Sequence, residues 1–274
     1  MRYIKVKFTG LTGEVSDMLI AMLSDIGFNG FEEGENELLA YADEGNYDPG
    51  ELEDIAVALG IAYETETLTH QNWNALWESN FQPVVVDDVC TIRAHFHDIQ
   101  TSTPYEIIIT PKMSFGTGHH ATTQLMVMQM KDMDFRGKCV LDFGTGTGVL
   151  AIFAEMLGAD AILAIDNDEW SVENAIENAA RNNCSHITVK KASMEDSPEI
   201  KSDIILANIN RHILLQYMGD MYERLADDGL IVMSGLLDAD RDIITESAGN
   251  AGFDLVNERG INGWIALLFS KNKK

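Results

Sequence analysis

Residues 141–152 read LDFGTGTGVLAI, and the later apolar run AILAID ends in an aspartate, Asp166. The β-prone residues before the glycines and the apolar residues after them predict a buried strand that turns sharply into a helix. Glycines fit such a turn because side chains would block it. A glycine-rich turn with an acid at the end of the next strand is typical of a cradle for a nucleotide-like cofactor.

The glycine spacing distinguishes two kinds of cofactor. Enzymes that bind dinucleotides place glycines as GxGxxG, so that the backbone can approach a pyrophosphate. Here Gly144, Gly146 and Gly148 form GxGxG. Val149 stands where the third dinucleotide glycine would fall, and Asp142 precedes the turn. A carboxylate would repel a pyrophosphate and attract a ligand with ammonium and sulfonium groups, so the pattern resembles class I S-adenosylmethionine-dependent methyltransferases.

Asp166 has a functional and a purely structural interpretation. In methyltransferases of this class, the acid that ends the second strand accepts hydrogen bonds from both ribose hydroxyls, and Asp166 occupies this place in AIDND. Each hydrogen bond to a charged acceptor contributes about 1.5 to 3 kcal/mol. Alternatively, GTGTG only makes a tight turn and Asp166 caps the helix expected from Asp168. The glycine turn and the two acids together favour cofactor binding.

Length and composition limit the class of protein. A chain of 274 residues can form two domains, each with its own core. It begins MRYIKVKFTG, without the apolar core of a signal peptide, and no run reaches the length of a membrane span. We therefore expect a cytoplasmic protein with no membrane contact. Cys90, Cys139 and Cys184 are widely scattered, which argues against a disulfide framework or a zinc site.

The chain is strongly acidic, with 19 basic and 44 acidic residues and a formal net charge of -25. This charge disfavours nucleic acid as a partner and suits a basic protein. The excess is uneven, because residues 1–85 contain 3 basic and 16 acidic residues. The N-terminal part is therefore either an acidic docking face or a surface whose charge only maintains solubility.

Residues 1–70 are predicted to form a small α+β domain with the ferredoxin-like order βαββαβ. Pro49 favours the first turn of its second helix, and Gly60 favours the end of that helix. The domain contains no obvious catalytic constellation, so we expect it to bind or dock. Its expected elements are strand 3–8, helix 13–26, strands 28–34 and 37–42, helix 49–59 and strand 61–68.

Residues 71–112 are predicted to connect this domain to the catalytic part through a helix and short strands at 84–86, 91–96 and 106–110. Trp73 and Trp77 lie four residues apart and would share one helical face. They could stack on a ligand, but packing between domains is the more ordinary use of such a pair.

Residues 113–274 alternate between β and α patterns, which predicts a Rossmann-like domain with a mostly parallel, seven-stranded sheet. Helices are expected from Ala121, Gly148, Glu169 and Ala239, and one more is expected to end at Leu225. The expected strands are 139–143, 161–165, 187–189, 203–207, 230–234, 253–258 and 264–269.

Two further motifs could face the ligand. FGTGHHATT, at residues 115–123, precedes a helix, and its glycines and hydroxyls suit a loop that faces the cofactor. In LANINRHILL a strand ends at Asn208, the usual ligand position at the carboxyl end of a parallel strand. Methyltransferases that act on planar amide or base nitrogens carry two prolines and an aromatic residue there, which NINR lacks. A tetrahedral amine needs no such stacking platform, so a lysine side chain or a chain's amino terminus is the more natural acceptor.

Taken together, FGTGHHATT, DFGTGTG, AIDND and ANI resemble the PrmA family, the methyltransferases of large-subunit ribosomal protein eleven. The match covers nearly the whole chain, including the acidic N-terminal domain and the WxxxW segment followed by FQPVVV. The resemblance implies methylation of lysine side chains and the N-terminal amine of that ribosomal protein, which the small domain recognises. It also implies cofactor contacts at Thr123, Gly144, Asp166 and Asn208.

The chain departs from the family pattern in places that bear on this assignment. The family's loop usually reads GTGTHPTT, whereas here His119 replaces the threonine and Ala121 the proline. The connector CTIRAHFHD also lacks the proline and tryptophan that are common there. Thr122 and Thr123 are retained, so we expect cofactor binding to be retained as well.

Methyl transfer to an amine is an in-line displacement from a sulfonium, and it needs a neutral nitrogen about 3 Å from the methyl carbon. A free lysine has a pKa near 10.4, so something must remove its proton. Water, His120 in the loop and His212 after Asn208 are the possible acceptors. We expect Asn208 and His120 to take part in catalysis, and we expect no metal, because the histidines lack a third ligand at a recognisable spacing.

Two other functions fit the same motifs. A small-molecule methyltransferase could use residues 1–70 to cover its site or to dimerise, and a non-catalytic protein could bind S-adenosylmethionine without turnover. We favour a monomeric enzyme that methylates the ribosomal protein before it joins the ribosome, because an acidic domain would be repelled by ribosomal RNA.

Overall fold

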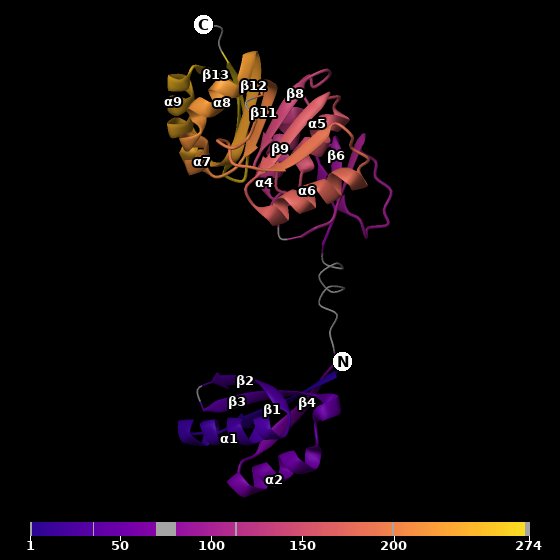
Figure 1. Ribbon diagram of the computed structural model, residues 1–274, viewed down its shortest axis with the longest axis vertical. Helices are drawn as coiled ribbons and strands as arrows, with labels where there is room; N and C mark the ends of the chain where they lie inside the picture. The colour runs from indigo at the N-terminus through magenta and orange to yellow at the C-terminus, as the bar shows by residue number, and fades with distance from the viewer. Residues whose placement is uncertain (1, 35, 70–80, 113, 199, 272–274) are drawn as a thin grey trace. The chain divides into compact units, whose positions relative to one another are not determined.

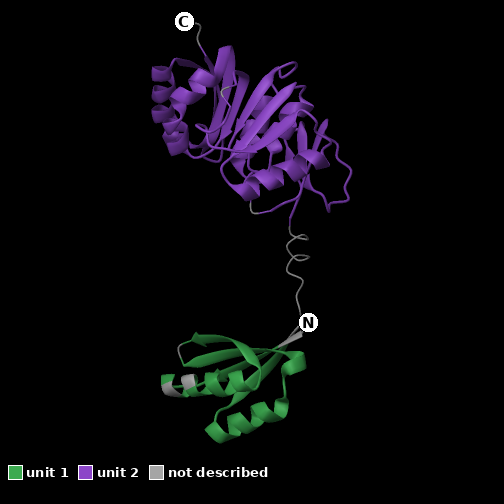
Figure 2. Ribbon diagram, viewed as in Figure 1, with its two compact units in different colours: residues 1–80 green, residues 81–274 purple. Residues whose placement is uncertain are grey.

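The computed structural model describes residues 2–34, 36–69, 81–112, 114–198 and 200–271. The chain forms two compact units, residues 1–80 and residues 81–274, which are coloured separately in Figure 2. The helix predicted around Trp73 and Trp77 lies outside the described residues. Within the described ranges, no helix is long and apolar enough to cross a membrane.

Unit 1 has the predicted order βαββαβ, and its four strands form an antiparallel sheet in the order β2-β3-β1-β4. Helices α1 and α2 pack on one face of this sheet (Figure 1). This is the ferredoxin-like arrangement expected from the sequence. The elements are β1 (Arg2–Thr9), α1 (Gly13–Asp25), β2 (Phe28–Gly34), β3 (Glu37–Asp43), the short 3-10 turn η1 (Glu44–Asn46), α2 (Pro49–Leu59) and β4 (Tyr63–Thr69).

Local signals explain where α2 starts and stops. The side chain of Asp48 accepts a hydrogen bond from the backbone N–H of Gly50 at 2.7 Å, and Pro49 occupies the first turn. Gly60 ends the helix in the left-handed region, with φ of 66°. The apolar sides of the helices and strands meet in a core that includes Phe8, Leu19, Leu23, Leu38 and Leu52.

Unit 2 is built on a seven-stranded sheet in the order β10-β9-β8-β11-β12-β14-β13. The five strands from β10 to β12 run parallel, and β14 pairs antiparallel with both β12 and β13. The strands are β8 (Cys139–Phe143), β9 (Ala161–Asp166), β10 (Ile187–Lys191), β11 (Ser202–Asn208), β12 (Leu225–Leu237), β13 (Phe253–Ile261) and β14 (Trp264–Lys271).

Helices cover both faces of this sheet, as expected for a parallel winding. Helices α4, α5 and α6 form one layer, and α7, α8 and α9 form the other (Figure 1). Each layer has its own core, around Phe153 on the first side and Phe269 on the second. The helices are α4 (Ala121–Met130), α5 (Val149–Met156), α6 (Glu169–Arg181), α7 (Arg211–Gln216), α8 (Met218–Arg224) and α9 (Arg241–Ala251), with the 3-10 turn η2 (Asp238–Asp240) before α9.

A small three-stranded sheet of β5 (Val84–Val86), β6 (Cys90–Ala94) and β7 (Tyr105–Ile109) packs beside α5 and α6. Asparagines four residues apart join α6 to β7. Asn182 accepts from the backbone N–H of Ile108 at 2.9 Å and donates to its carbonyl at 2.7 Å. Asn178 accepts from the N–H of Thr110, and Asn174 donates to the carbonyl of Thr110. This asparagine ladder fixes α6 against the small sheet.

Some boundaries differ from the sequence prediction. The helix expected to end at Leu225 consists of two short helices, α7 and α8, which meet at Tyr217, where the tyrosine ring packs edge-on against Phe143 at 5.7 Å. Strand β12 extends beyond the predicted 230–234 at both ends. The residues from Phe81 onward, including β5 to β7, group with unit 2.

Candidate functional site

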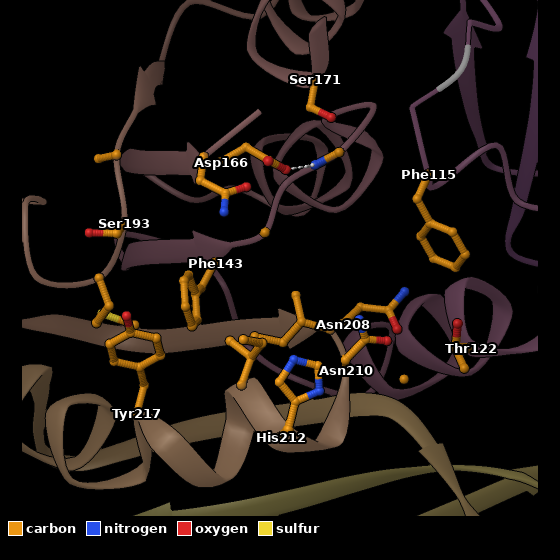
Figure 3. Close-up of a pocket in the computed structure, with 18 of the residues that line it drawn as sticks. Phe115, Thr122, Phe143, Asp166, Ser171, Ser193, Asn208, Asn210, His212 and Tyr217 are labelled. Carbon is orange, nitrogen blue, oxygen red and sulfur yellow. Dashed lines mark hydrogen bonds between the residues drawn. The ribbon is translucent and has the colours of Figure 1, made fainter. Parts of the chain in front are cut away.

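A cavity of about 590 Å³ lies in unit 2 at the carboxyl ends of β8, β9 and β11. The chain order reverses between β8 and β11, and such switch points are where open α/β sheets bind ligands. In Figure 3, Asp166 and Ser171 lie on one side, His212 and Tyr217 on another, and Asn208 and Asn210 between them. The lining comprises Phe115, His120, Thr122, Phe143, Gly144, Gly146, Asp166, Asn167, Ser171, Ala192, Ser193, Met194, Asn208, Ile209, Asn210, His212, Ile213, Tyr217, Gly235 and Trp264.

The glycine turn forms one wall, and packing explains why it contains glycines. Gly144 has φ of 77°, and a Cβ there would lie 2.3 Å from a methyl carbon of Ile209. Gly146 has φ of 55°, and its Cβ would lie 2.3 Å from the carbonyl oxygen of Phe115. Both positions therefore exclude any side chain. Gly148 is at the start of α5, away from the lining, and approaches Ala175 of α6.

Asp166 lines the cavity at the end of β9 and also holds the turn. Its Oδ2 accepts a hydrogen bond from the N–H of Gly146 at 3.0 Å, drawn as a dashed line in Figure 3. Its Oδ1 accepts from the N–H of Asp168 at 3.0 Å. Asp168, rather than Asp166, caps α6 by accepting from the N–H of Ser171. The half-buried carboxylate thus lines the cavity while two backbone N–H donors hold it in place.

Asp142 was also predicted to contact the ligand, and the structure places it beneath the turn. The residue is fully buried, and its Oδ2 accepts a hydrogen bond from the hydroxyl of Thr145 at 2.6 Å. Burial raises the pKa of Asp142 from 3.8 to about 7, against the lowering effect of the Thr145 hydrogen bond. Asp142 is not among the lining residues, so its visible role is to support the turn.

Asn208 lies at the end of β11, between β8 and β12, and lines the cavity. Its Oδ1 is buried and has no hydrogen-bond partner among the described residues. A buried amide oxygen without a partner costs about 1 to 3 kcal/mol, so this position favours a ligand that donates a hydrogen bond to it. The position was predicted from the end of the strand alone.

The loop of residues 114–120 lies against the glycine turn. The backbone N–H of Thr147 donates to the carbonyl of Phe115 at 2.9 Å, and the Thr147 hydroxyl donates to that of Gly116 at 2.8 Å. Thr122, the next residue after the start of α4, lines the cavity. Thr123, which was predicted to contact the cofactor, is fully buried and does not line the cavity, and its hydroxyl has no partner among the described residues.

His120 caps α4 and lines the cavity. Its Nδ1 accepts a hydrogen bond from the backbone N–H of Thr122 at 3.3 Å and lies 2.7 Å from the Thr122 hydroxyl. An accepting Nδ1 places the proton of the neutral ring on Nε2. His120 therefore contributes its ring to the cavity lining, with Nδ1 engaged by Thr122. His212 lines the cavity from α7.

Aromatic rings form the part of the lining that sequence reasoning missed. The ring of His120 lies edge-on to Trp264 at 4.5 Å and to Phe115 at 5.3 Å. Trp264 is the first residue of β14, near the C-terminus of the chain. The only sequence signal for it was its position at the start of a predicted strand. Phe143 and Tyr217 form a second aromatic pair in the lining.

Other histidines have local structural roles. His97 bonds to the carbonyl of Phe81 through Nε2 at 2.6 Å and accepts from the N–H of Ala94 through Nδ1. Among the described residues, no three His, Cys, Asp or Glu side chains lie close enough together to hold a metal ion.

The strand order, the glycine turn and the acid at the end of the second strand define a class I methyltransferase. A family model described as ribosomal protein L11 methyltransferase (PrmA) matches residues 30–272. The chain therefore belongs to the ribosomal protein L11 methyltransferase family, as its motifs had indicated.

Individual relatives agree. A ribosomal protein L11 methyltransferase from Porphyromonas gingivalis is 43% identical over 263 residues, which cover 93% of this chain and 90% of the relative. One from Phocaeicola vulgatus is 38% identical, covering 98% of this chain and 99% of the relative. The crystal structure of a ribosomal protein L11 methylase from Lactobacillus delbrueckii subsp. bulgaricus superposes with a TM-score of 0.66 at 30% identity, covering 70% of this chain and all of that chain.

Proposed function

We propose that this protein transfers methyl groups from S-adenosylmethionine to amino groups of ribosomal protein L11, on lysine side chains and the N-terminal amine. The observation that carries the proposal is one cavity shared by the glycine turn, the Asp166 carboxylate and the unpartnered amide of Asn208. It occurs in a chain of the matching family.

The cavity fits the cofactor by chemistry and by size. Its volume lies within the range of small-molecule sites, about 300 to 1,000 Å³. Each oxygen of the Asp166 carboxylate has a further lone pair that can accept from a ribose hydroxyl, and Gly144 and Gly146 let a ligand approach the backbone. The Asn208 amide oxygen can accept from an ammonium group. The bound cofactor supplies an electrophilic methyl group on a sulfonium sulfur.

Three predicted site residues do not line the cavity and are instead proposed to support the residues that do. Asp142 bonds to Thr145 in the turn, Gly148 allows α5 to approach α6, and Thr123 lies in the first turn of α4 beside Thr122. We assign them to shaping the cofactor site, with Thr122 facing the ligand. The hydroxyl of Thr123 is buried and has no hydrogen-bond partner among the described residues.

We assign the aromatic wall of Phe115, His120 and Trp264 to the acceptor amine. Aromatic faces attract a substituted ammonium and cover the apolar stem of a lysine. The amide oxygen of Asn208 can then accept from an N–H of the amine and orient its nitrogen, with the lone pair free, toward the methyl group. Because the Nδ1 of His120 is already engaged, the amine's proton leaves to water or to His212.

Unit 1 is the proposed recognition module for the basic ribosomal protein. Two of its basic residues, Lys5 and Lys7, are paired with Glu66 and Glu37. Many other acids point to solvent, namely Asp25, Glu32, Glu33, Glu44, Asp48, Glu51, Glu53, Asp54 and Glu64. A basic protein free in the cytoplasm would complement this surface, whereas ribosomal RNA would be repelled. We therefore propose a monomer that acts on the ribosomal protein before ribosome assembly.

The test is transfer of labelled methyl groups to purified, unmodified ribosomal protein L11, read by mass spectrometry of the product. We expect several methyl groups on amines, and no transfer by the Asp166→Ala variant. Cofactor binding without incorporation would favour a protein that only binds S-adenosylmethionine. Equal transfer to small amines, unaffected by deletion of residues 1–70, would favour a small-molecule methyltransferase.

A further inference from the structure

Phe81, the first residue of unit 2, is surrounded by rings from two other segments. Its ring lies edge-on to His119, with centroids 4.7 Å apart and planes at 70°. It lies nearly parallel to the ring of His97 at 6.0 Å and edge-on to Phe96 at 6.2 Å. His119 belongs to the loop of residues 114–120 and precedes His120, which lines the cavity. The Phe81 ring thus touches the loop that forms part of the site.

Phe81 is itself held firmly in place. Its carbonyl accepts a hydrogen bond from His97 Nε2 at 2.6 Å, and the Nδ1 of the same ring accepts from the N–H of Ala94. The carbonyl of His97 accepts from the Arg93 guanidinium at 3.0 Å. Both Ala94 and Arg93 belong to β6. Phe81 therefore provides a rigid ring, tied to the small sheet, for His119 to rest on.

The loop has separate supports at its two ends. The first half is bound to the glycine turn, because Thr147 donates to the carbonyls of Phe115 and Gly116. The second half approaches β6 at Gly118, where a Cβ would lie 2.8 Å from Ile92. Beyond Gly118, Gln124 donates to the carbonyls of Gly118 and His119 at 3.1 and 3.4 Å, and the His119 ring, whose Nδ1 lies 3.1 Å from the Thr117 hydroxyl, rests against Phe81. Gly116 and Gly118 both have positive φ, so the stretch between these supports is built from flexible backbone.

We propose that His119 is a positioning residue. Through its contact with Phe81 it holds the second half of the loop, and so sets the place of His120 and Phe115 at the cavity. This proposal rests on the proposed function only where binding of a cofactor analogue is measured. The contact between His119 and Phe81 is present in the protein with no ligand bound.

The first experiment measures the affinity for S-adenosylhomocysteine, a non-reacting probe, by calorimetry without any ribosomal protein. The interaction free energy of an edge-to-face ring pair corresponds to about a twofold to tenfold change in affinity. We therefore expect His119→Ala and Phe81→Ala each to bind S-adenosylhomocysteine about twofold to tenfold more weakly. The double variant should bind no more weakly than Phe81→Ala, because that change already removes the contact with His119. His119→Phe keeps the ring and should restore the affinity. Additive effects of the two alanine changes, or unchanged affinity, would overturn the proposal.

The second experiment needs no cofactor and separates this idea from the proposed function. Hydrogen exchange followed by mass spectrometry should show faster exchange at residues 115–120 in His119→Ala, but not in His119→Phe. His186→Ala, at an exposed histidine in the turn before β10, serves as the control and should leave this loop unchanged. Equal exchange of the loop in the wild type and in His119→Ala would refute the positioning role even if S-adenosylhomocysteine does not bind.

Discussion

The carboxylate of Asp166 accepts a hydrogen bond from the backbone N–H of Gly146 at 3.0 Å, although the two residues belong to different βα turns. The acid therefore has two functions at once, because it braces the glycine turn and presents its charge to the cavity. A glycine is required at this bond, since a Cβ on residue 146 would meet the carbonyl of Phe115. The proposed cofactor contact and the shape of the turn thus depend on the same carboxylate.

Asp166→Ala should weaken the binding of S-adenosylhomocysteine by about tenfold to a hundredfold or more. The variant loses a charged acceptor whose hydrogen bonds are each worth about 1.5 to 3 kcal/mol. Calorimetric titration measures the change. Asp160→Ala, at an exposed acid just before β9, is the matched control and should bind as the wild type does. Wild-type affinity in Asp166→Ala would remove this residue from the cofactor site.

Gly146→Ala should lower both stability and cofactor affinity. The new Cβ would lie 2.3 Å from the Phe115 carbonyl, and the φ of 55° strains any side chain, so we expect a loss of about 1 to 3 kcal/mol. The control is Gly249→Ala, because Gly249 lies in α9 with open space around it. That change should stabilise the protein by up to about 1 kcal/mol. Thermal unfolding of both variants compares them directly, and equal melting temperatures would contradict the packing argument.

Asp142→Asn should stabilise the protein at alkaline pH and have much less effect at pH 5. Burial raises the pKa of this carboxyl from 3.8 to about 7, so the folded state retains a proton that the unfolded state releases over this interval. The wild type therefore loses stability as pH rises from about 4 through 7, and the uncharged amide does not. The difference should reach about 2 to 4 kcal/mol above pH 8.

The measurement is denaturant unfolding of both proteins from pH 5 to pH 9. Taking the difference between variant and wild type removes the effect of the other acids. A stability difference that does not change with pH would mean that Asp142 is ionised throughout this range in the folded protein.

Periodicity and turn residues predicted most of the fold. The β-prone run Cys139–Phe143 and the GTGTG turn predicted strand β8 and helix α5 of unit 2, and Pro49 and Gly60 marked the ends of α2. These signals are local, because they depend on residues close together in the sequence. The strand ends also identified Asp166 and Asn208, since the parallel winding places their carboxyl ends at one edge.

The other part of the site depends on contacts between distant residues. Trp264 packs against His120, although more than half of the residues of unit 2 separate them along the chain. No local sequence pattern around either residue predicts this contact. The choice between Thr122 and Thr123 depends on how α4 is rotated against its neighbours, which adjacent identical residues cannot reveal. Burial likewise distinguishes Asp142, which is fully buried, from Asp166, which lines the cavity, although both acids lie within one residue of the end of a strand.

Affinity for ribosomal protein L11 should fall as salt is raised from 0.05 to 1 M. The Debye length shortens from about 10 Å near 0.1 M to about 3 Å at 1 M, which screens the acids of unit 1. Binding assays at several salt concentrations measure the slope, and S-adenosylhomocysteine binding at the same concentrations is the control. An affinity for the ribosomal protein that is independent of salt would exclude charge-driven docking.

Asn182→Ala should destabilise unit 2 by about 1 to 3 kcal/mol, because it leaves the N–H and the carbonyl of Ile108 without their partner. Asn250→Ala, on the exposed side of α9, is the control and should change stability by less than about 0.5 kcal/mol. Chemical denaturation compares the two variants. Equal stability would mean that water replaces the asparagine at no cost.

The asparagine ladder also covers an edge of the small sheet. β7 is an outer strand of its sheet, and a bare outer strand is a template on which another chain can add a strand. The side chains of Asn174, Asn178 and Asn182 occupy the backbone groups of Ile108 and Thr110 that an incoming strand would need. Helix α6 therefore shields β7 from edge-to-edge aggregation, and the protection comes from amide side chains rather than from charge.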